Sequence, residues 1–386
     1  MSSSTFSATR KIEPLISIRF LLAFRVMTRH TIGFFVPGVN DMAPAGTARS
    51  FLWHQIIAPS FSVNFFFLLS GYVLALAYLR DGQGVAKGRF FAARFARIYP
   101  LYLVTLLWDT PGLLMDRVAR LGWTTAIAKT VGTLAAHLVM LQAWCPARLS
   151  GLDSPNWSLS AETFFYLCFP VLGVALWRMR GMRLWTTAVC LYCGGQAAVW
   201  LVQPHLRVDT VLVNPLLHLS TFALGVLLAR WQALRLRQPE LPPVRAWQAN
   251  AVLVGSLAAL FVANQFPARF PEYDFTFTGL LAPIFMGVIW SLSSARTLAT
   301  RALSARWLVV LGNSSYALYL IHIPMFHMFK YLRPQNRLEL YPVYLAACVG
   351  LSVASFYYFE TPARRWLLKL FHSRTMESPE AASIAQ

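Results

Sequence analysis

The amino-acid sequence predicts an all-α integral membrane protein with about ten transmembrane helices and with both termini in the cytoplasm. Hydrophobic residue types make up 57% of the 386 residues and charged types 13%, which is about half the charged share of a soluble domain. Apolar runs of roughly 20 residues, the length that crosses a bilayer, recur along the chain. The net charge of +19 lies in short basic clusters between these runs. Such clusters are typical of topology determinants and not of a nucleic-acid-binding face, so no nucleic-acid partner is expected.

The predicted membrane spans follow one another with short loops. They are 15–36, 61–79, 98–115, 158–177, 184–203, 211–229, 247–265, 276–294, 307–329 and 341–359. With the N-terminus inside, every inner loop is basic, and the inner loops hold roughly twice as many Lys and Arg residues as the outer ones. Segment 125–141 contains Lys129 and His137, and we predict an amphipathic or half-inserted helix there, because an eleventh span would reverse the later loops.

The chain is predicted to form one membrane domain over residues 13–371. Residues 1–12 form a cytoplasmic N-terminal segment, and the polar residues 372–386 form a disordered cytoplasmic tail. No internal repeat is visible, which argues mildly against transporters built from duplicated halves. Cys190 and Cys193 form a C-x-x-C within an apolar run. No second ligand pair follows, so no metal site is predicted.

The first predicted span carries unusual charge. Residues 17–35, SIRFLLAFRVMTRHTIGFF, contain Arg19, Arg25, Arg29 and His30. An ionisable residue in mid-membrane costs about 2.5–3.5 kcal/mol on insertion scales and is usually functional. Arg19 and His30 lie about three helical turns and about 16 Å apart, on nearly the same side. Either these groups pair with acids or carbonyls of other spans, or they line a polar cavity running inward from the cytoplasm, where a neutral imidazole could take a proton from a hydroxyl.

A second cluster lies in the predicted inner loop KGRFFAARFARIYPLYL. Arg94 and Arg97 are three residues apart and would be neighbours on a helix. Two adjacent guanidinium groups favour phosphate, carboxylate or lipid headgroups. The cluster is therefore either an anion site or a topology determinant that touches anionic lipid.

Three further segments carry polar residues inside predicted spans. In DSPNWSLSAETFFYLCFP, a turn at PNWS should lead into a helix, which places Trp157 and Glu162 near its start. Glu162 could neutralise the arginines of the first span or accept a proton. In LGNSSYALYLIHIPMF, His322 lies mid-span near Tyr316 and Tyr319, and a purely structural histidine is an open alternative. In FFLLSGYVLAL, Ser70 and Gly71 would allow helices to approach closely.

Together these motifs resemble the acyltransferase-3 family of bacterial membrane O-acyltransferases. The resemblance runs from about residue 13 to 366, in the family's order. The corresponding residues are Arg19 with His30; FFLLSG at 66–71; Arg94, Arg97 and Pro100 in ARFARIYP; Trp157 to Glu162; Tyr316 to His322; and Glu360, Pro362, Arg364 and Arg365. The chain departs from the family's pattern at Ile16 and Asn64, where Asp is common, and Arg25 and Arg29 are additions.

The resemblance implies a stand-alone O-acyltransferase, most often an O-acetyltransferase, in the bacterial inner membrane. It implies acyl-CoA (acetyl-CoA) as co-substrate with no permanently bound cofactor, and a glycan or lipid-linked sugar as acceptor. His30 would be the general base or, alternatively, a transient acyl carrier. Arg19 would orient the donor or stabilise the thioester oxyanion, and Glu162 would hold His30 or the substrate. Donor phosphates would bind Arg94 and Arg97. The residues expected to support the site are Ser70, Trp157, Tyr316 and His322. The alternatives are a transporter or flippase that uses the same buried charges, or a scaffolding protein.

Overall fold

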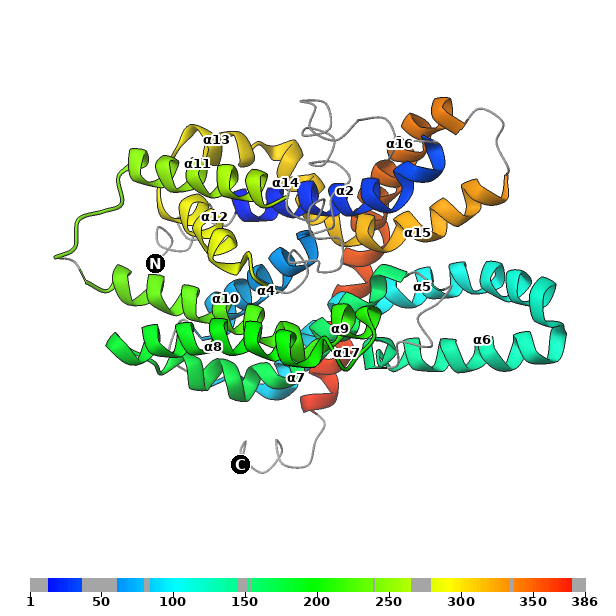
Figure 1. The fold of residues 1–386 in the computed structure, drawn as a ribbon, viewed down its shortest axis with the longest axis horizontal. Helices are drawn as coiled ribbons and strands as arrows, with labels where there is room; N and C mark the ends of the chain where they lie inside the picture. Colours follow the sequence, from blue (N-terminus) through cyan, green and yellow to red (C-terminus); the bar gives the residue numbers. More distant parts are fainter. Residues whose placement is uncertain are drawn as a thin grey trace.

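The structure is a computed structural model, and every regular element in the part it describes is a helix (Figure 1). The described residues are 13–36, 61–79, 84–144, 152, 154–238, 240–264, 279–332 and 337–376. The predicted all-α class is therefore confirmed for these residues. Residues 1–12 and the end of the predicted tail lie outside the described residues, whereas the last helix continues past 371 to Met376.

The α-helices occur in the following order. They are α2 (Glu13–Phe35), α4 (Ser62–Tyr78), α5 (Lys87–Leu121), α6 (Trp123–Leu138), α7 (Trp157–Trp177), α8 (Gly181–Val202), α9 (Val208–Val213), α10 (Pro215–Leu236), α11 (Ala246–Ala263), α12 (Ala282–Ser294), α13 (Leu298–Leu303), α14 (Arg306–Asn313), α15 (Ser315–Tyr331), α16 (Arg337–Ser355) and α17 (Thr361–Met376). Short 3₁₀ turns cover Gln142–Trp144 and Ser154–Asn156, and a π-helical turn, Phe356–Glu360, joins α16 to α17.

Each predicted span overlaps a described helix, but length and composition alone support fewer crossings than ten. Six of the described helices are long and apolar enough to cross a membrane, and seven if α14 and α15, which meet at a 57° bend, form one span. Helix α2 is 23 residues long, yet its arginines make it too polar for this set. Helices α4 and α12 are apolar but shorter. The count of ten and the cytoplasmic termini stay predictions.

Helices α4 and α10 pack against each other through glycine. A Cβ built on Gly71 of α4 would collide with the backbone carbonyl of Phe222, and one built on Gly225 of α10 would collide with that of Leu68. The two backbones therefore touch, as small residues allow in membrane bundles. The predicted close approach at Ser70–Gly71 is confirmed, and it brings Ser70 close to α7.

Helix α6 is present where the amphipathic segment was predicted, and it folds back along α5. The two form a hairpin that extends beyond the other helices, at the right of Figure 1. The buried side chains of α6 recur at three- and four-residue spacing, at Ala126, Thr130, Thr133 and His137. Arg117 of α5 donates to the hydroxyl groups of Thr130 and Thr133, at 3.3 and 3.1 Å.

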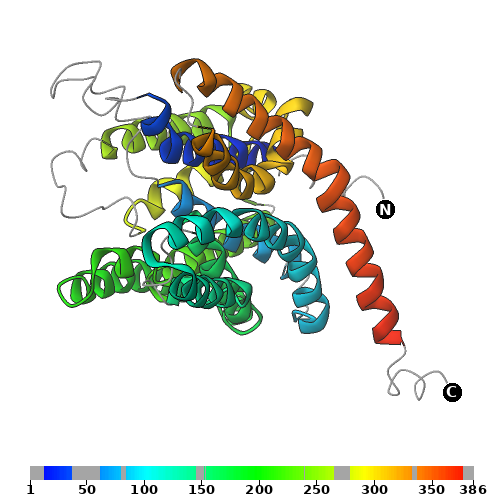
Figure 2. The same ribbon diagram turned by 90° about the vertical axis from the view of Figure 1, so that its right-hand side faces the viewer.

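The helices nearest the two ends of the described chain pack against different partners. Helix α2 lies against α14 and α15, and α17 and the π-helical turn pack on α5. Figure 2 shows α16 and α17 as one long rod, orange to red, along one side of the molecule. This packing brings Arg19 of α2, Glu360 of the π-helical turn and Arg364 of α17 near Arg97 of α5.

Candidate active site

A cavity of about 130 Å³ lies where α2, α4, α5, α7 and α15 converge. Its polar lining comes from all five helices. The residues that supply it are Arg19, Ser70, Arg94, Arg97, Ser158, Glu162, Tyr166, Ser315, Tyr316 and Tyr319. The structure thus brings together Arg19, both arginines of the α5 pair and Glu162, which the sequence had suggested separately.

Glu162 is held by two hydroxyl groups on one oxygen atom. Ser70 of α4 donates to Oε1 at 3.0 Å, and Tyr166, one turn further along α7, donates to the same atom at 2.5 Å. Two donors to one carboxylate oxygen fix the orientation of the carboxylate. Ser70 therefore supports Glu162 directly, in addition to sitting beside the α4–α10 contact.

Arg19 and Arg97 make no hydrogen bond or ion pair with protein groups in the described part of the chain. Both side chains are half-buried and line the cavity. The carboxylates of Glu162 and Glu360 lie close enough to act on Arg19 electrostatically, as does the positive charge of Arg97. Guanidinium groups that are partly desolvated without a bonded partner are prepared to bind an anion.

Arg94 is held differently, by aromatic rings. It donates through one terminal nitrogen to the Tyr78 hydroxyl at 3.2 Å. Its guanidinium also lies 5.6 Å from the ring centre of Tyr78 and 5.8 Å from that of Tyr166, within the range of cation–π attraction. Tyr166 thus connects Arg94 to Glu162, and it orients a cation and an anion in the same cavity.

His30 forms a pair with His322 of α15. Its Nδ1 lies 3.1 Å from Nε2 of His322, whose own Nδ1 lies 2.7 Å from the carbonyl oxygen of Tyr319. A carbonyl oxygen only accepts, so His322 Nδ1 carries the hydrogen, and neutral His322 accepts at Nε2. His30 Nδ1 must then donate, which leaves the lone pair on His30 Nε2. The network assigns the tautomer that a general base requires.

His30 does not line the cavity that contains Arg19. It lies further along α2, near the end of the helix, and its residue is exposed, whereas His322 is fully buried. The structure therefore separates the predicted site into two parts: the cavity with its arginines, and a histidine pair beyond it. Helix α2 connects the two parts, because it carries both Arg19 and His30.

The remaining predicted residues pack around the cavity. Tyr316 lines it and donates to the carbonyl oxygen of Ile98 at 2.7 Å. Trp157 is buried outside the lining, where its ring packs edge-on against Phe67 at a centroid distance of 5.9 Å. Trp157 thus supports the wall of the cavity and does not enter it. The helix start predicted after PNWS is confirmed, because α7 begins at Trp157.

Sequence reasoning did not assign roles to Tyr166, Glu360 or Arg364. The spacing of Tyr166 could have indicated its role, because it lies four residues after Glu162 and so on the same helical face.

Glu360 and Arg364 belong to a motif named in the sequence analysis, but only the packing of the helices shows that they lie beside the cavity. Buried Glu360 ends the π-helical turn, and its charge acts on Arg97 and Arg19. Arg364 lies near Arg97 and Arg94. Such turns are frequent at functional sites.

The additional arginines of the first helix lie outside the cavity lining. Arg25 stacks over the Phe61 ring at 4.5 Å, and Arg29 is exposed. Among the described residues, no three His, Cys, Asp or Glu side chains are grouped so as to hold a metal ion.

A family model described as an acyltransferase domain matches residues 15–359, nearly the whole bundle that forms the cavity. The chain belongs to the acyltransferase-3 family. The predicted resemblance is confirmed, and with it a multi-pass membrane acyltransferase that transfers groups other than aminoacyl groups.

Curated relatives agree with this assignment. Acyltransferase MdmB of Streptomyces mycarofaciens is 30% identical over 337 residues, which cover 81% of this acyltransferase and 78% of the relative. A Staphylococcus aureus (strain COL) protein, provisionally named an O-acetyltransferase, is 25% identical over 387 residues, covering 91% of this chain and 61% of its own length. Protein 2 in the picA locus of Rhizobium radiobacter is 44% identical over 130 residues, 30% of this chain and 66% of that protein. No solved structure matches.

Proposed function

We propose that this acyltransferase moves an acyl group, with acetyl the first expectation, from acyl-CoA to a hydroxyl group of a surface glycan or of its lipid-linked precursor. The observation that carries the proposal is the cavity. Arg19 and Arg97 enter it without a protein partner in the described part of the chain, and Arg94 and an oriented carboxylate lie beside them. A polyphosphorylated thioester matches that charge pattern.

The arginines would bind the donor. Guanidinium groups bind phosphate oxygens with two parallel hydrogen bonds. Arg94 and Arg97 lie in the first part of α5, and Arg364 lies near both. In the proposed topology this end of α5 lies on the cytoplasmic side of a bacterial inner membrane, and acyl-CoA is present in the cytoplasm. The pantetheine arm would then extend along α2, past Arg19 and towards His30.

The histidine pair would supply the base. Nε2 of His30 takes the proton of the acceptor hydroxyl as its oxygen attacks the thioester carbonyl carbon. Arg19 stabilises the oxyanion that develops. When the carbon–sulfur bond breaks, the coenzyme A thiolate receives the proton held by His30, and the ester leaves. His322 positions the base by keeping the hydrogen on His30 Nδ1.

The experiment that tests this function measures coenzyme A release and acyl incorporation in proteoliposomes that contain the purified enzyme. Replacing the proposed base, His30→Ala, should lower both rates by about 10²- to 10⁴-fold, with insertion and thermal stability unchanged. His205→Ala, at an exposed histidine between α8 and α9, is the matched control.

Normal acylation by the His30→Ala variant would contradict the catalytic assignment. Substrate movement across the vesicle membrane without coenzyme A release would favour a transporter instead. Mass spectrometry of surface polysaccharide from cells with and without the gene would identify the acceptor and acyl group together, because the mass difference per sugar unit is diagnostic.

A further inference from the structure

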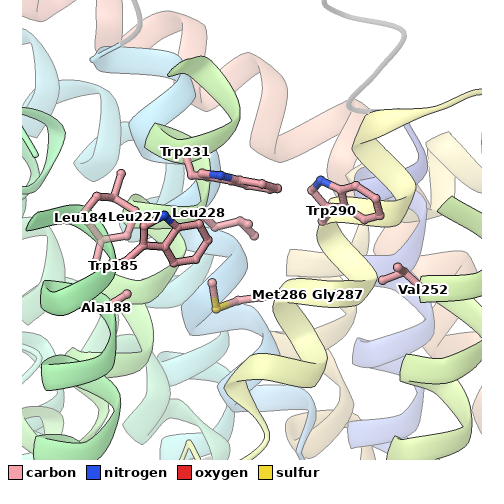
Figure 3. A pocket seen from close by; sticks show the side chains of 10 residues that line it. All are labelled: Leu184, Trp185, Ala188, Leu227, Leu228, Trp231, Val252, Met286, Gly287 and Trp290. Carbon is pink, nitrogen blue, oxygen red and sulfur yellow. The ribbon is translucent and has the colours of Figure 1, made fainter. Parts of the chain in front are cut away.

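A second cavity differs from the arginine cavity because its lining is apolar. It is a tryptophan-lined groove of about 200 Å³, with α8 and α10 on one side and α11 and α12 on the other. Figure 3 shows its side chains. They are Leu184, Trp185, Ala188, Leu227, Leu228, Trp231, Val252, Met286, Gly287 and Trp290. None carries a charge, so a hydrocarbon chain is the chemistry that this groove fits.

The groove has a buried side and an exposed side. Leu184, Leu227 and Leu228 are almost fully buried and form its floor, whereas Trp185 is 51% exposed and Val252 37% exposed. Helix α10 packs on α4 through Gly225, and α4 in turn lines the arginine cavity. The α4–α10 pair therefore separates the groove from the candidate active site, and an occupant of the groove would not be in line for acyl transfer.

Three tryptophans line the groove, and Trp231 and Trp290 lie at one level in Figure 3. Trp185 and Trp231 have ring centroids 6.0 Å apart, and Trp231 and Trp290 lie 6.5 Å apart on facing walls (Figure 3). Tryptophan is enriched at membrane–water interfaces, where its ring meets hydrocarbon and its N–H meets polar groups. The indole nitrogen of Trp290 is buried and has no hydrogen-bond partner among the described residues. In Figure 3 it lies on the side of the ring nearer Trp231.

Basic residues lie just beyond the tryptophan level. Arg235 is in the last turn of α10, four residues after Trp231 and so on the same face. Arg180 and Arg183 are exposed at the start of α8. Buried Arg230 donates to the carbonyl oxygen of Met179 at 3.2 Å, and Arg180 and Arg237 lie close enough to act on its charge. The loop between α10 and α11 contains one acidic residue, Glu240.

We propose that this groove binds an anionic membrane phospholipid, with one acyl chain between the helices and the phosphate at Arg183 and Arg235. An apolar slot with a tryptophan level and a basic end complements an amphiphile with a negative headgroup, and basic pockets between membrane helices bind such headgroups. An ester carbonyl of the lipid accepts from the Trp290 N–H. The short slot and its separation from the arginine cavity favour a membrane phospholipid over a lipid-linked acceptor.

The test is native mass spectrometry of the full-length protein in detergent, titrated with phosphatidylglycerol or phosphatidylcholine. The wild type should retain phosphatidylglycerol about tenfold more strongly. The double variant Arg183→Gln with Arg235→Gln should bind the two lipids equally, because it removes the headgroup contacts. Trp290→Phe keeps the ring but removes the donor, and should weaken retention of both lipids. Lys87→Gln with Arg89→Gln removes two exposed charges on α5, outside the groove, and should change nothing.

Three results would overturn the proposal. The first is equal retention of both lipids by the wild type. The second is preferential binding of a polyprenyl phosphate over phosphatidylglycerol, which would make the groove an acceptor site. The third is a dimer that the Trp290→Phe variant dissociates, which would make a second copy of the chain the occupant. Because the experiment measures lipid binding, its result is independent of whether the acyl transfer proposed above is correct.

Discussion

At the scale of single residues, the two halves of the candidate site place different demands on their side chains. In the cavity, Arg19 and Arg97 present hydrogen-bond donors without a partner in the described chain, so they resemble a binding surface more than a structural ion pair. In the histidine pair, three of the four ring nitrogens form the hydrogen bonds described above, and Nε2 of His30 keeps its lone pair. In the proposed mechanism this division separates donor binding from proton transfer, so single substitutions should separate the two in kinetics.

Replacing His322 by alanine should lower kcat about 10- to 100-fold without changing KM for acyl-CoA. The reason is that His322 holds the tautomer of His30 and does not line the cavity. Steady-state kinetics in proteoliposomes with varied acyl-CoA would measure both constants, and His205→Ala serves again as control. A rise in KM with unchanged kcat would show that His322 acts on donor binding instead.

Replacing Arg97 by glutamine should raise KM for acyl-CoA at least tenfold, since a charge-assisted hydrogen bond to phosphate is lost. The sharper measurement compares acyl-CoA with the corresponding acyl-pantetheine, which has no phosphate. Wild type and variant should use acyl-pantetheine equally well. If the variant is impaired to the same degree with both donors, Arg97 acts on structure or chemistry and not on the phosphates. Arg29→Gln, at an exposed arginine outside the cavity, is the matched control.

At the scale of elements, the contact between α4 and α10 controls the position of Ser70 and hence of Glu162. Both glycines of this contact face a backbone carbonyl of the other helix. A backbone cannot move aside as a flexible side chain can, so an added methyl group must push the helices apart.

Substituting Gly71→Ala or Gly225→Ala should therefore destabilise the protein by about 1–3 kcal/mol and reduce activity by displacing Ser70 from Glu162. Gly255→Ala in α11 is the control, because nothing lies within 4 Å of a Cβ built there. Alanine is the better helix former, so this control should be neutral or slightly stabilising. Thermal unfolding in detergent measures the effect, and equal melting temperatures for all three variants would disprove the proposed contact.

At the scale of the whole molecule, residues from distant parts of the sequence form the site. Helix α2 supplies Arg19, α5 supplies Arg94 and Arg97, and the π-helical turn between α16 and α17 supplies Glu360 near them. The charges of the site therefore depend on the relative placement of helices that are more than 300 residues apart.

The proposed topology places the α8–α9 loop outside the cell and the α10–α11 loop in the cytoplasm. In a cysteine-free background, the variant His205→Cys should react with a membrane-impermeant maleimide in intact spheroplasts. Gln238→Cys should react only after permeabilisation. The reverse pattern would overturn the predicted orientation, and labelling of both sites from outside would overturn the number of spans between them.

The sequence by itself determined the helices and most of the candidate residues. Runs of about 20 apolar residues and basic loops are local features, so the helices, the amphipathic α6 and the close approach at Gly71 could be predicted from composition and spacing. Arg19 and Glu162 could be named because charge inside an apolar run is costly wherever the helix packs, and Arg94 and Arg97 because two guanidinium groups three residues apart on a helix are neighbours that favour an anion.

Only the tertiary structure decided which of these residues meet. Helical periodicity specifies which face a side chain occupies but not which neighbour that face contacts. The Ser70–Glu162–Tyr166 group, the pairing of His30 with His322 and the approach of Glu360 therefore could not be derived from spacing. The same reason explains why the tryptophan groove was not predicted: Trp185, Trp231 and Trp290 look like ordinary interfacial residues until four helices bring them to one opening.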